Sequence, residues 1–139
     1  MVQIIAGEKG RGKTPYLLEK ANEAVKSAEG TIVFIDKNAK HMHDLDIKIR
    51  LINITQFPIT SVDGFLGFIA GIISQDHDLE YVFLDSFLTI AHIEAKDSAE
   101  TFDALEKLSA KYSVNFVVSV SASEADIPDN AKKDIVLSL

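Results

Sequence analysis

The stretch that decides the fold is residues 7–14, which read GEKGRGKT. It matches the pattern G-x-x-x-x-G-K-[ST] at every fixed position. The apolar run VQIIA precedes it, and a helical pattern of apolar residues follows it. A strand, then a glycine loop, then a helix is the context that this pattern requires, so the surroundings support the match.

The residue types in this stretch are those that hold a phosphate group. Glycines at 7, 10 and 12 let the loop take left-handed dihedrals and direct backbone N–H groups at an anion. We expect Lys13 to reach the β- and γ-phosphate oxygens and Thr14 to offer its hydroxyl to a Mg²⁺ ion. The N-terminus of the following helix adds partial positive charge. The expected nucleotide-binding residues are Gly7, Glu8, Lys9, Gly10, Arg11, Gly12, Lys13, Thr14 and Pro15.

Length and composition narrow the class of protein. A chain of 139 residues predicts one domain, residues 1–139. The net charge of −7, with arginine only at Arg11 and Arg50, argues against a general nucleic-acid binder. Cysteine is absent, which excludes disulfides and thiolate metal sites. We find no signal-peptide pattern and no apolar run that spans a bilayer, so we expect a cytoplasmic protein without a membrane span.

Apolar runs alternate with amphipathic patterns along the whole chain. Strands are expected at residues 2–6, 31–35, 47–54, 79–84, 114–120 and 135–139, and helices at 17–28, 61–73 and 99–112. The strand at 47–54 is half-exposed by its alternation, which indicates a sheet edge. Strands that alternate with helices predict an α/β fold, a three-layer αβα sandwich with a mainly parallel sheet.

The helix boundaries and faces follow from spacing. Gly30 is expected just past the end of the first helix, at C′. Thr60 and Asp63 stand at capping-box spacing before the second helix, which is expected to start near Ser61.

The glycines of the second helix, Gly64, Gly67 and Gly71, predict close packing on the sheet, with an oligomer contact as the less favoured alternative. The inner face of the third helix is expected to be Ala99, Phe102, Leu105, Leu108 and Tyr112.

Three connections carry polar residues or leave alternatives open. Residues 37–46 include two histidines and two aspartates, but no further spacing supports a metal site, and a solvated connection is favoured. Residues 87–93 are either a loop packed over the sheet or a short helix, and residues 126–133 are expected to be a polar turn.

A second chemical signal is the carboxylate of Asp85, which follows the apolar run YVFL. At the carboxyl end of a buried strand it is placed to hold Mg²⁺ through water. Asp36 ends a strand in the same way and competes for this role. Ser119, Ser121 and Ser123 follow another strand, where they either sense the γ-phosphate or solvate a turn.

With these motifs placed, the chain resembles the P-loop NTPases, nearest to the RecA/DnaB/KaiC-like ATPases. The residues behind the likeness are the complete Walker A loop, FIDKN at 34–38 and FLDS at 83–86. A weaker likeness is to the ATPases of secretion and of type IV pilus retraction. The resemblance implies a RecA-like sheet in the order last strand, first strand, then the strands at 114–120, 81–85, 31–36 and 50–54.

The chain also departs from that family where water is activated. Asn38 stands where RecA-like ATPases carry a catalytic Glu, and no Glu follows Asp85. An amide can hold a water but cannot accept its proton, so slow or absent hydrolysis is expected. The candidate catalytic residues are therefore Lys13 and Asn38. The AKKD of residues 131–134 matches the GTPase motif [NT]KxD only in part, because alanine stands at its first position. We therefore expect the protein to prefer ATP to GTP.

Three functions remain open from the sequence. The leading hypothesis is an ATP- and Mg²⁺-binding protein with slow or absent hydrolysis, either regulatory or part of a larger assembly. The second is an active ATPase or small phosphotransferase, with Glu8, Glu94 or Glu124 as base. The third is a non-catalytic interaction module on a P-loop scaffold, which binds a protein partner or another copy.

Overall fold

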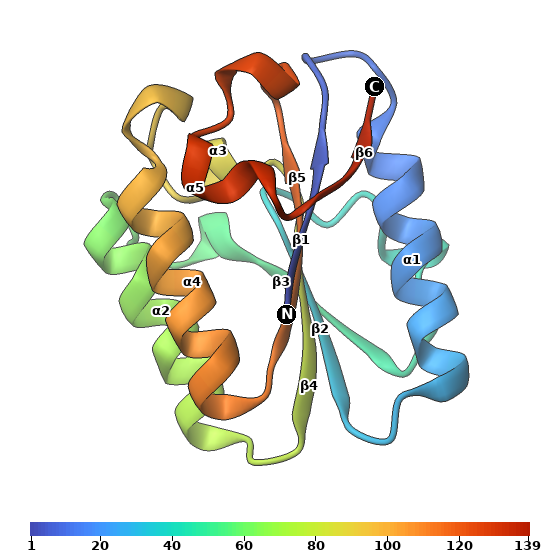
Figure 1. Ribbon diagram of the computed structural model, residues 1–139. Helices are drawn as coiled ribbons and strands as arrows, with labels where there is room; N and C mark the ends of the chain where they lie inside the picture. The colour runs from blue at the N-terminus through green and yellow to red at the C-terminus, as the bar shows by residue number, and fades with distance from the viewer.

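The computed structural model describes residues 1–139 and shows an α/β fold built on one six-stranded sheet. Its strands are β1 (Val2–Ala6), β2 (Thr31–Asp36), β3 (Ile49–Asn53), β4 (Leu79–Leu84), β5 (Asn115–Val120) and β6 (Ile135–Ser138). Its helices are α1 (Lys13–Ser27), α2 (Val62–Gln75), α3 (Phe87–Ile90), α4 (Ala99–Tyr112) and α5 (Asp129–Lys132). Short 3-10 turns lie at Met42–Asp44, Ile54–Gln56, Ala95–Asp97 and Glu124–Asp126. Helix α1 covers one face of the sheet and α2 and α4 cover the other, which gives three layers (Figure 1).

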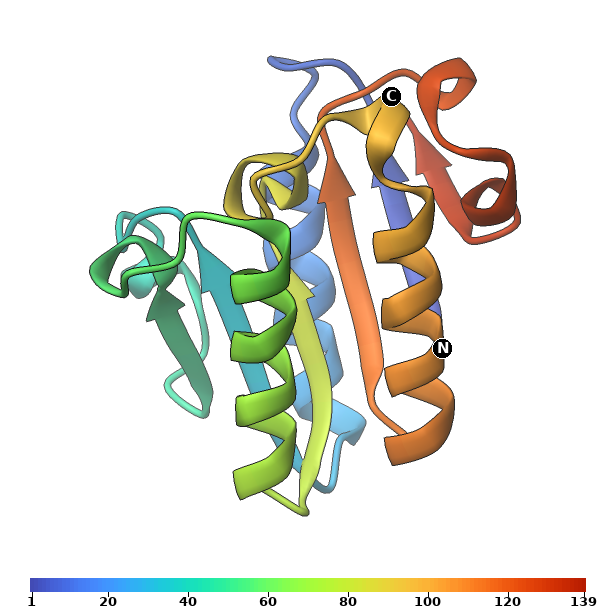
Figure 2. The same ribbon diagram turned by 90° about the vertical axis from the view of Figure 1, so that its left-hand side faces the viewer.

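All strands run parallel, in the order β3-β2-β4-β5-β1-β6. Figure 2 shows their arrowheads at the same edge of the sheet. This order is the one that the resemblance implied, and that prediction is confirmed. The loops after β1, β2, β4 and β5 therefore leave the sheet at one shared edge, where open parallel sheets bind ligands.

The sheet has a hydrophobic core on each face. A cluster of 24 buried residues lies between the sheet and α2 and α4, and a cluster of 9 lies under α1. In β2, Val33 and Ile35 belong to the larger cluster, whereas Ile32 and Phe34 belong to the smaller one. Because both faces of the strand are covered, its apolar run is continuous rather than alternating.

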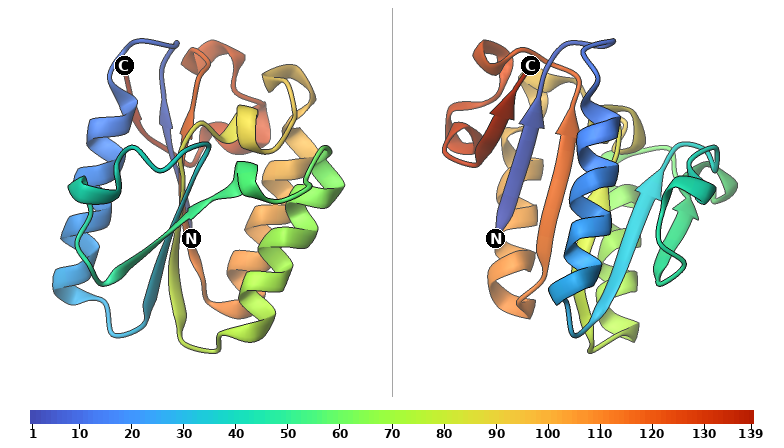
Figure 3. Two further views of the ribbon diagram at one scale, coloured as in Figure 1. Left: turned by 180° about the vertical axis from the view of Figure 1, so that it is seen from behind. Right: turned by 90° about the vertical axis from the view of Figure 1, so that its right-hand side faces the viewer.

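Strand β3 is the edge strand that its alternating pattern predicted. It pairs with β2 alone, and Ile49 is buried while the next residue, Arg50, is exposed. The strand begins at Ile49 rather than at residue 47, because a turn closed by Ile49 N–H on Asp46 O (2.9 Å) precedes it. Ile47 in this turn is 99% exposed. Figure 3 shows this connection beside α1.

Two details predicted for α2 are wrong. Its N-cap is Ser61, whose Oγ accepts the Gly64 N–H at 3.0 Å, so the cap lies one residue after Thr60. Gly67 and Gly71 are exposed, with open space where a Cβ would stand. The bulky stripe of the helix, which includes Ile69, faces the sheet, so these glycines lie on the solvent side rather than at a close contact.

Two further predictions need correction. Tyr112 is 48% exposed, and polar Thr101 and Ser109 are buried on α4 instead. Gly30 is not a helix C′ residue, since α1 ends at Ser27 with Ala28 as its cap. A Cβ at Gly30 would lie 2.0 Å from Asp78 O, so this glycine permits a close approach of two backbones. 

The two ambiguous or polar connections form short helices. Residues 87–90 form α3, the helical alternative for the apolar segment after β4. Residues 129–132 form α5 within the segment that was expected to be a polar turn, because apolar Ala131 packs inward there. No helix has the length and apolar character needed to cross a bilayer.

Candidate functional site

The loop between β1 and α1 adopts a conformation that its glycines permit. Gly10 and Gly12 have φ of 87° and 84°, in the left-handed region that strains residues with a Cβ. Gly12 directly precedes α1, and no side chain caps this end of the helix. The first N–H groups of α1 are therefore available to a ligand, and the helix dipole favours an anion there.

Gly7 serves packing rather than loop conformation, since its φ is not positive. It is buried, its N–H donates to Ala122 O at 2.9 Å, and a Cβ would lie 3.1 Å from the Leu139 Cβ. The expectation that all three glycines adopt left-handed dihedrals is thus wrong for Gly7.

Lys13 is a buried cation without a negatively charged hydrogen-bond partner. The residue is 7% exposed, and its Nζ donates to Glu8 O at 3.1 Å. Burial lowers the pKa of the Lys13 ammonium, while the nearby charge of Asp85 acts in the opposite direction. A phosphate oxygen would supply a counter-charge at close range, which is favourable for an ammonium that has lost much of its hydration.

Thr14, Asp85 and Ser119 form one hydrogen-bond chain across three elements. The Thr14 hydroxyl donates to Asp85 Oδ2 at 3.0 Å, and the Ser119 hydroxyl donates to Asp85 Oδ1 at 2.6 Å. Ser119 Oγ also accepts the Ser86 N–H at 2.9 Å. The start of α1, the end of β4 and the end of β5 are thereby fixed relative to one another. Hard oxygen donors such as a hydroxyl and a carboxylate suit Mg²⁺, which binds few protein ligands and keeps water and phosphate oxygens.

Asp36 lies one strand away from Asp85 and is also buried. Burial raises the pKa of the Asp36 carboxyl, and the charge of Asp85 raises it further. A hydrogen bond of 2.7 Å from the Lys37 N–H to Oδ1 acts in the opposite direction. Asp36 is therefore a buried carboxylate beside the chain of Thr14, Asp85 and Ser119 rather than a member of it.

A pocket of about 500 Å³ joins these groups. From the loop and the start of α1 it is lined by Lys9, Gly10, Gly12, Lys13, Thr14 and Pro15. From the ends of the neighbouring strands it is lined by Lys37, Lys40, Asp85, Ser86, Thr89, Ser119 and Ser121. No Leu, Ile, Val, Met or aromatic side chain lines it, so its surface suits a charged ligand rather than an apolar one.

Not every residue expected at the site lines this pocket. Gly7, Glu8 and Arg11 of the loop do not, and neither do Asp36 and Asn38. The Asn38 Oδ1 instead accepts the Lys40 N–H at 3.1 Å and closes a tight turn.

Two lysines at the site, Lys37 and Lys40, were missed by sequence reasoning. The signal that could have found them is their position directly after Asp36, which already marked a strand end at the ligand edge of the sheet.

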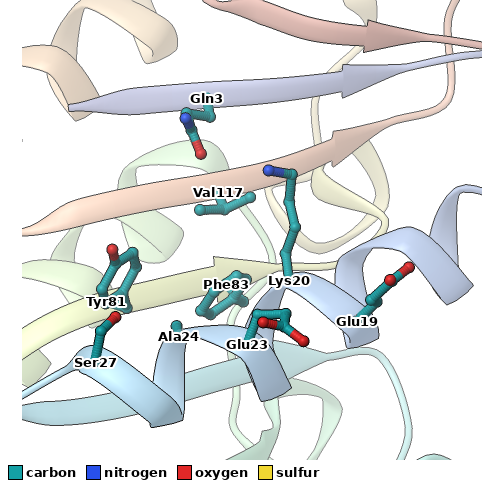
Figure 4. A pocket seen from close by; sticks show the side chains of 9 residues that line it. All are labelled: Gln3, Glu19, Lys20, Glu23, Ala24, Ser27, Tyr81, Phe83 and Val117. Carbon is teal, nitrogen blue, oxygen red and sulfur yellow. The ribbon is translucent and has the colours of Figure 1, made fainter.

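A second hollow, of about 440 Å³, lies beside α1 at a distance along the strands from the glycine loop (Figure 4). Its floor is apolar, formed by Phe83, Val117 and Ala24, and its rim carries Lys20 and Glu23. It has neither a helix N-terminus nor a cluster of cations, so nothing there favours a phosphate group.

The remaining polar motifs lie outside the pocket. In the connection after β2, His41 Nδ1 and Asp44 Oδ2 are 3.0 Å apart, and no group of three or more His, Cys, Asp or Glu could hold a metal ion anywhere in the structure. In the AKKD segment, Lys132 pairs with Asp129 at 3.3 Å and Asp134 pairs with Lys133 at 3.2 Å. None of these residues lines the pocket.

Comparison of the chain with protein-family models and with curated protein sequences finds no match. 

Proposed function

We propose that the chain is a P-loop protein of the RecA-like type that binds a nucleoside triphosphate, with ATP preferred to GTP, together with Mg²⁺. The observation that carries the proposal is the convergence of an uncapped helix N-terminus, the buried Lys13 ammonium and the Thr14–Asp85 pair on one polar pocket. The six-stranded parallel sheet and its strand order support the same assignment.

In this proposal different residues of the chain bind the phosphates, bind the metal ion and position its ligand. Backbone N–H groups of the loop and of α1 hold the phosphates, and Lys13 neutralises the β- and γ-phosphate oxygens. Thr14 and Asp85 would hold Mg²⁺, which when bound screens the charge of the phosphates. Ser119 holds Asp85 in position through its hydrogen bond of 2.6 Å.

Slow or absent hydrolysis is part of the proposal. Asp85 is the only carboxylate that lines the pocket, and two hydroxyl groups already donate to it. The glutamates considered as alternative bases lie elsewhere. Glu8 and Glu94 line a neighbouring hollow, and Glu124 accepts a hydrogen bond from Ser138 at 3.1 Å. A site without a free carboxylate near the terminal phosphate has no group to accept the proton of an attacking water.

We infer that such a nucleotide binder with little turnover is regulatory or part of a larger assembly. The exposed Ile47 and the open edge of β3 offer a surface for a protein partner or a second copy. Light scattering with and without Mg²⁺-ATP tests this part of the proposal, because nucleotide-dependent assembly would raise the molar mass and a mass that always equals one chain would count against it.

Isothermal titration calorimetry with Mg²⁺ and a non-hydrolysable ATP analogue tests binding itself. We expect Lys13→Ala to weaken the affinity of the analogue by about a hundredfold, since it removes a charge-assisted contact from a buried position. Lys26→Ala is the matched control, because it removes the same charge from an exposed position on the same helix. Equal affinities in the two variants would contradict the proposal.

A further inference from the structure

We propose that Lys37 and Lys40, on the loop after β2, bind the terminal phosphate and make the site selective for triphosphates over diphosphates. This inference rests on the proposed function, and it assigns a specificity role that the Walker A loop does not supply.

The strand order gives the two lysines their place. Strand β2 is the neighbour of β4 on the side away from β1, so the loop after β2 and the glycine loop lie on opposite sides of the ends of β4 and β5. Asp85 lies at the end of β4, and its Oδ2 accepts a hydrogen bond of 3.0 Å from the Thr14 hydroxyl. A phosphate chain held at the N-terminus of α1 with its metal at Thr14 would thus present its terminal group toward the loop after β2.

The charges around the pocket indicate a ligand more anionic than a diphosphate. Four lysines line the pocket, Lys9, Lys13, Lys37 and Lys40, against the single carboxylate of Asp85. None of the four forms a salt bridge, although the chain has 21 Asp and Glu against 14 Lys and Arg. Cations that gather without carboxylate partners in an acidic protein are matched by charge to an anionic ligand.

The backbone that carries the two lysines is fixed at both ends. Next to β2, Asp36 Oδ1 accepts the Lys37 N–H at 2.7 Å and Asn38 Oδ1 accepts the Lys40 N–H at 3.1 Å. At the far end, Asn22 of α1 donates to Asp44 O at 2.9 Å and accepts the Asp46 N–H at 2.8 Å.

Helix α1 and the loop that carries the lysines are therefore held together by hydrogen bonds. The long Lys37 and Lys40 side chains are available to bind an anion, because both residues line the pocket and neither ammonium forms a salt bridge.

The same geometry gives Asn38 a role. Its side-chain oxygen closes the turn that presents Lys40, and Asn38 itself does not line the pocket. We infer that Asn38 positions a phosphate-binding lysine. This role differs from that of a catalytic base, which would activate water.

The test compares the affinities of ADP and of a non-hydrolysable ATP analogue by calorimetry, both with Mg²⁺, in the wild type and in the double variant Lys37→Ala, Lys40→Ala. We expect the double variant to lose about tenfold in affinity for the analogue and less than about threefold for ADP. The matched control is Lys48→Ala, Lys107→Ala, which removes the same charge from exposed positions that do not line the pocket. Lys37→Arg, Lys40→Arg keeps the charge and is expected to restore most of the preference for triphosphate.

The outcomes separate this inference from the proposed function. A wild type that binds neither nucleotide overturns both. A wild type that binds both nucleotides, with a double variant whose two affinities are unchanged or fall equally, overturns the selectivity role of Lys37 and Lys40 and leaves the proposed function standing. A control variant with the same selective loss would assign the effect to net charge and would also overturn the inference.

Discussion

The Ser119 hydroxyl at the end of β5 donates a hydrogen bond of 2.6 Å to Asp85 Oδ1 and accepts one of 2.9 Å from the Ser86 N–H. Both Ser119 and Asp85 are buried, so this serine ties two neighbouring strand ends together inside the structure. Sequence reasoning left open whether the serines after β5 sense a phosphate or solvate a turn. The structure shows that Ser119 does not solvate a turn, because its partners are the carboxylate and the backbone at the end of β4. Ser119 and Ser121 also line the pocket, so a contact of these serines with the terminal phosphate stays a prediction.

We expect Ser119→Ala to lower the free energy of unfolding by about 1–3 kcal/mol, because it removes the hydrogen bond of 2.6 Å to the buried Asp85 carboxylate and the acceptor of the half-buried Ser86 N–H. Urea denaturation measures this loss. Ser27→Ala, at an exposed position at the end of α1, is the control and is expected to change stability by less than about 0.5 kcal/mol. A Ser119→Ala variant as stable as the control would show that this hydrogen bond contributes nothing.

Removing the carboxylate of Asp85 is expected to remove the dependence of nucleotide binding on Mg²⁺. In the wild type, replacing Mg²⁺ with EDTA should weaken binding of the ATP analogue by about tenfold or more, because the metal shares the charge of the phosphates. In Asp85→Asn the two conditions should differ by less than about threefold. Calorimetry measures both, with the exposed Asp63→Asn as control. A full effect of Mg²⁺ in Asp85→Asn would remove Asp85 from the metal site.

Phe87 anchors the turn that carries Asp85 and Ser86. Its ring packs against Phe102 of α4 at 5.0 Å and edge-on to Phe65 of α2 at 5.9 Å between ring centroids, and it is fully buried. We expect Phe87→Ala to lower the free energy of unfolding by about 3–5 kcal/mol and Phe87→Leu by clearly less, since leucine leaves a smaller cavity. Equal losses in thermal or urea unfolding would show that the volume of the ring is not what stabilises this position.

The contribution of Asp134 to stability is expected to fall as pH rises from about 4 to about 6. Burial, with the hydrogen bond and the charge of Glu106, raises the pKa of the Asp134 carboxyl from 3.8 to about 6. A carboxyl whose pKa is higher in the folded state binds its proton more tightly there, so its contribution is complete below pH 3.8 and is lost as pH rises through about 6. The pKa of Glu106 is lowered, chiefly by its hydrogen bond with Asp134, so its own contribution has the opposite sign and is lost as pH falls.

The measurement is urea unfolding of the wild type and of Asp134→Asn at several values of pH between 4 and 7. The stability of the wild type relative to the variant should decline across that range, because the asparagine does not titrate. Asp129→Asn, at an exposed position on α5, is the control. A difference between wild type and Asp134→Asn that does not change with pH would contradict the raised pKa.

Much of the fold could be predicted because its signals are local. A few adjacent residues are enough to predict strand β2 and the glycine loop between β1 and α1. The resemblance to the RecA-like ATPases predicts the strand order. What failed depended on packing between elements. The exposure of Gly67 and Tyr112 depends on which way a helix is rotated, and the place of Gly30 depends on the backbone at Asp78.

The same contrast between local signals and packing applies to the residues of the candidate site. Lys13, Thr14 and Asp85 were predicted because each is marked by its own motif or strand end. The bond between Ser119 and Asp85 joins residues 34 positions apart, and no sequence pattern links them. Lys37 and Lys40 follow no motif, and only the neighbouring positions of β2 and β4 bring them to the pocket.

The central claim is tested most directly by a crystal structure of the wild-type protein grown with Mg²⁺ and a saturating non-hydrolysable ATP analogue. We expect density for the triphosphate in the loop from Gly10 to Thr14, with the metal at the Thr14 hydroxyl and Lys13 turned from Glu8 O to a phosphate oxygen. A loop free of phosphate at saturating nucleotide, or the analogue bound instead in the hollow beside α1, would contradict the account.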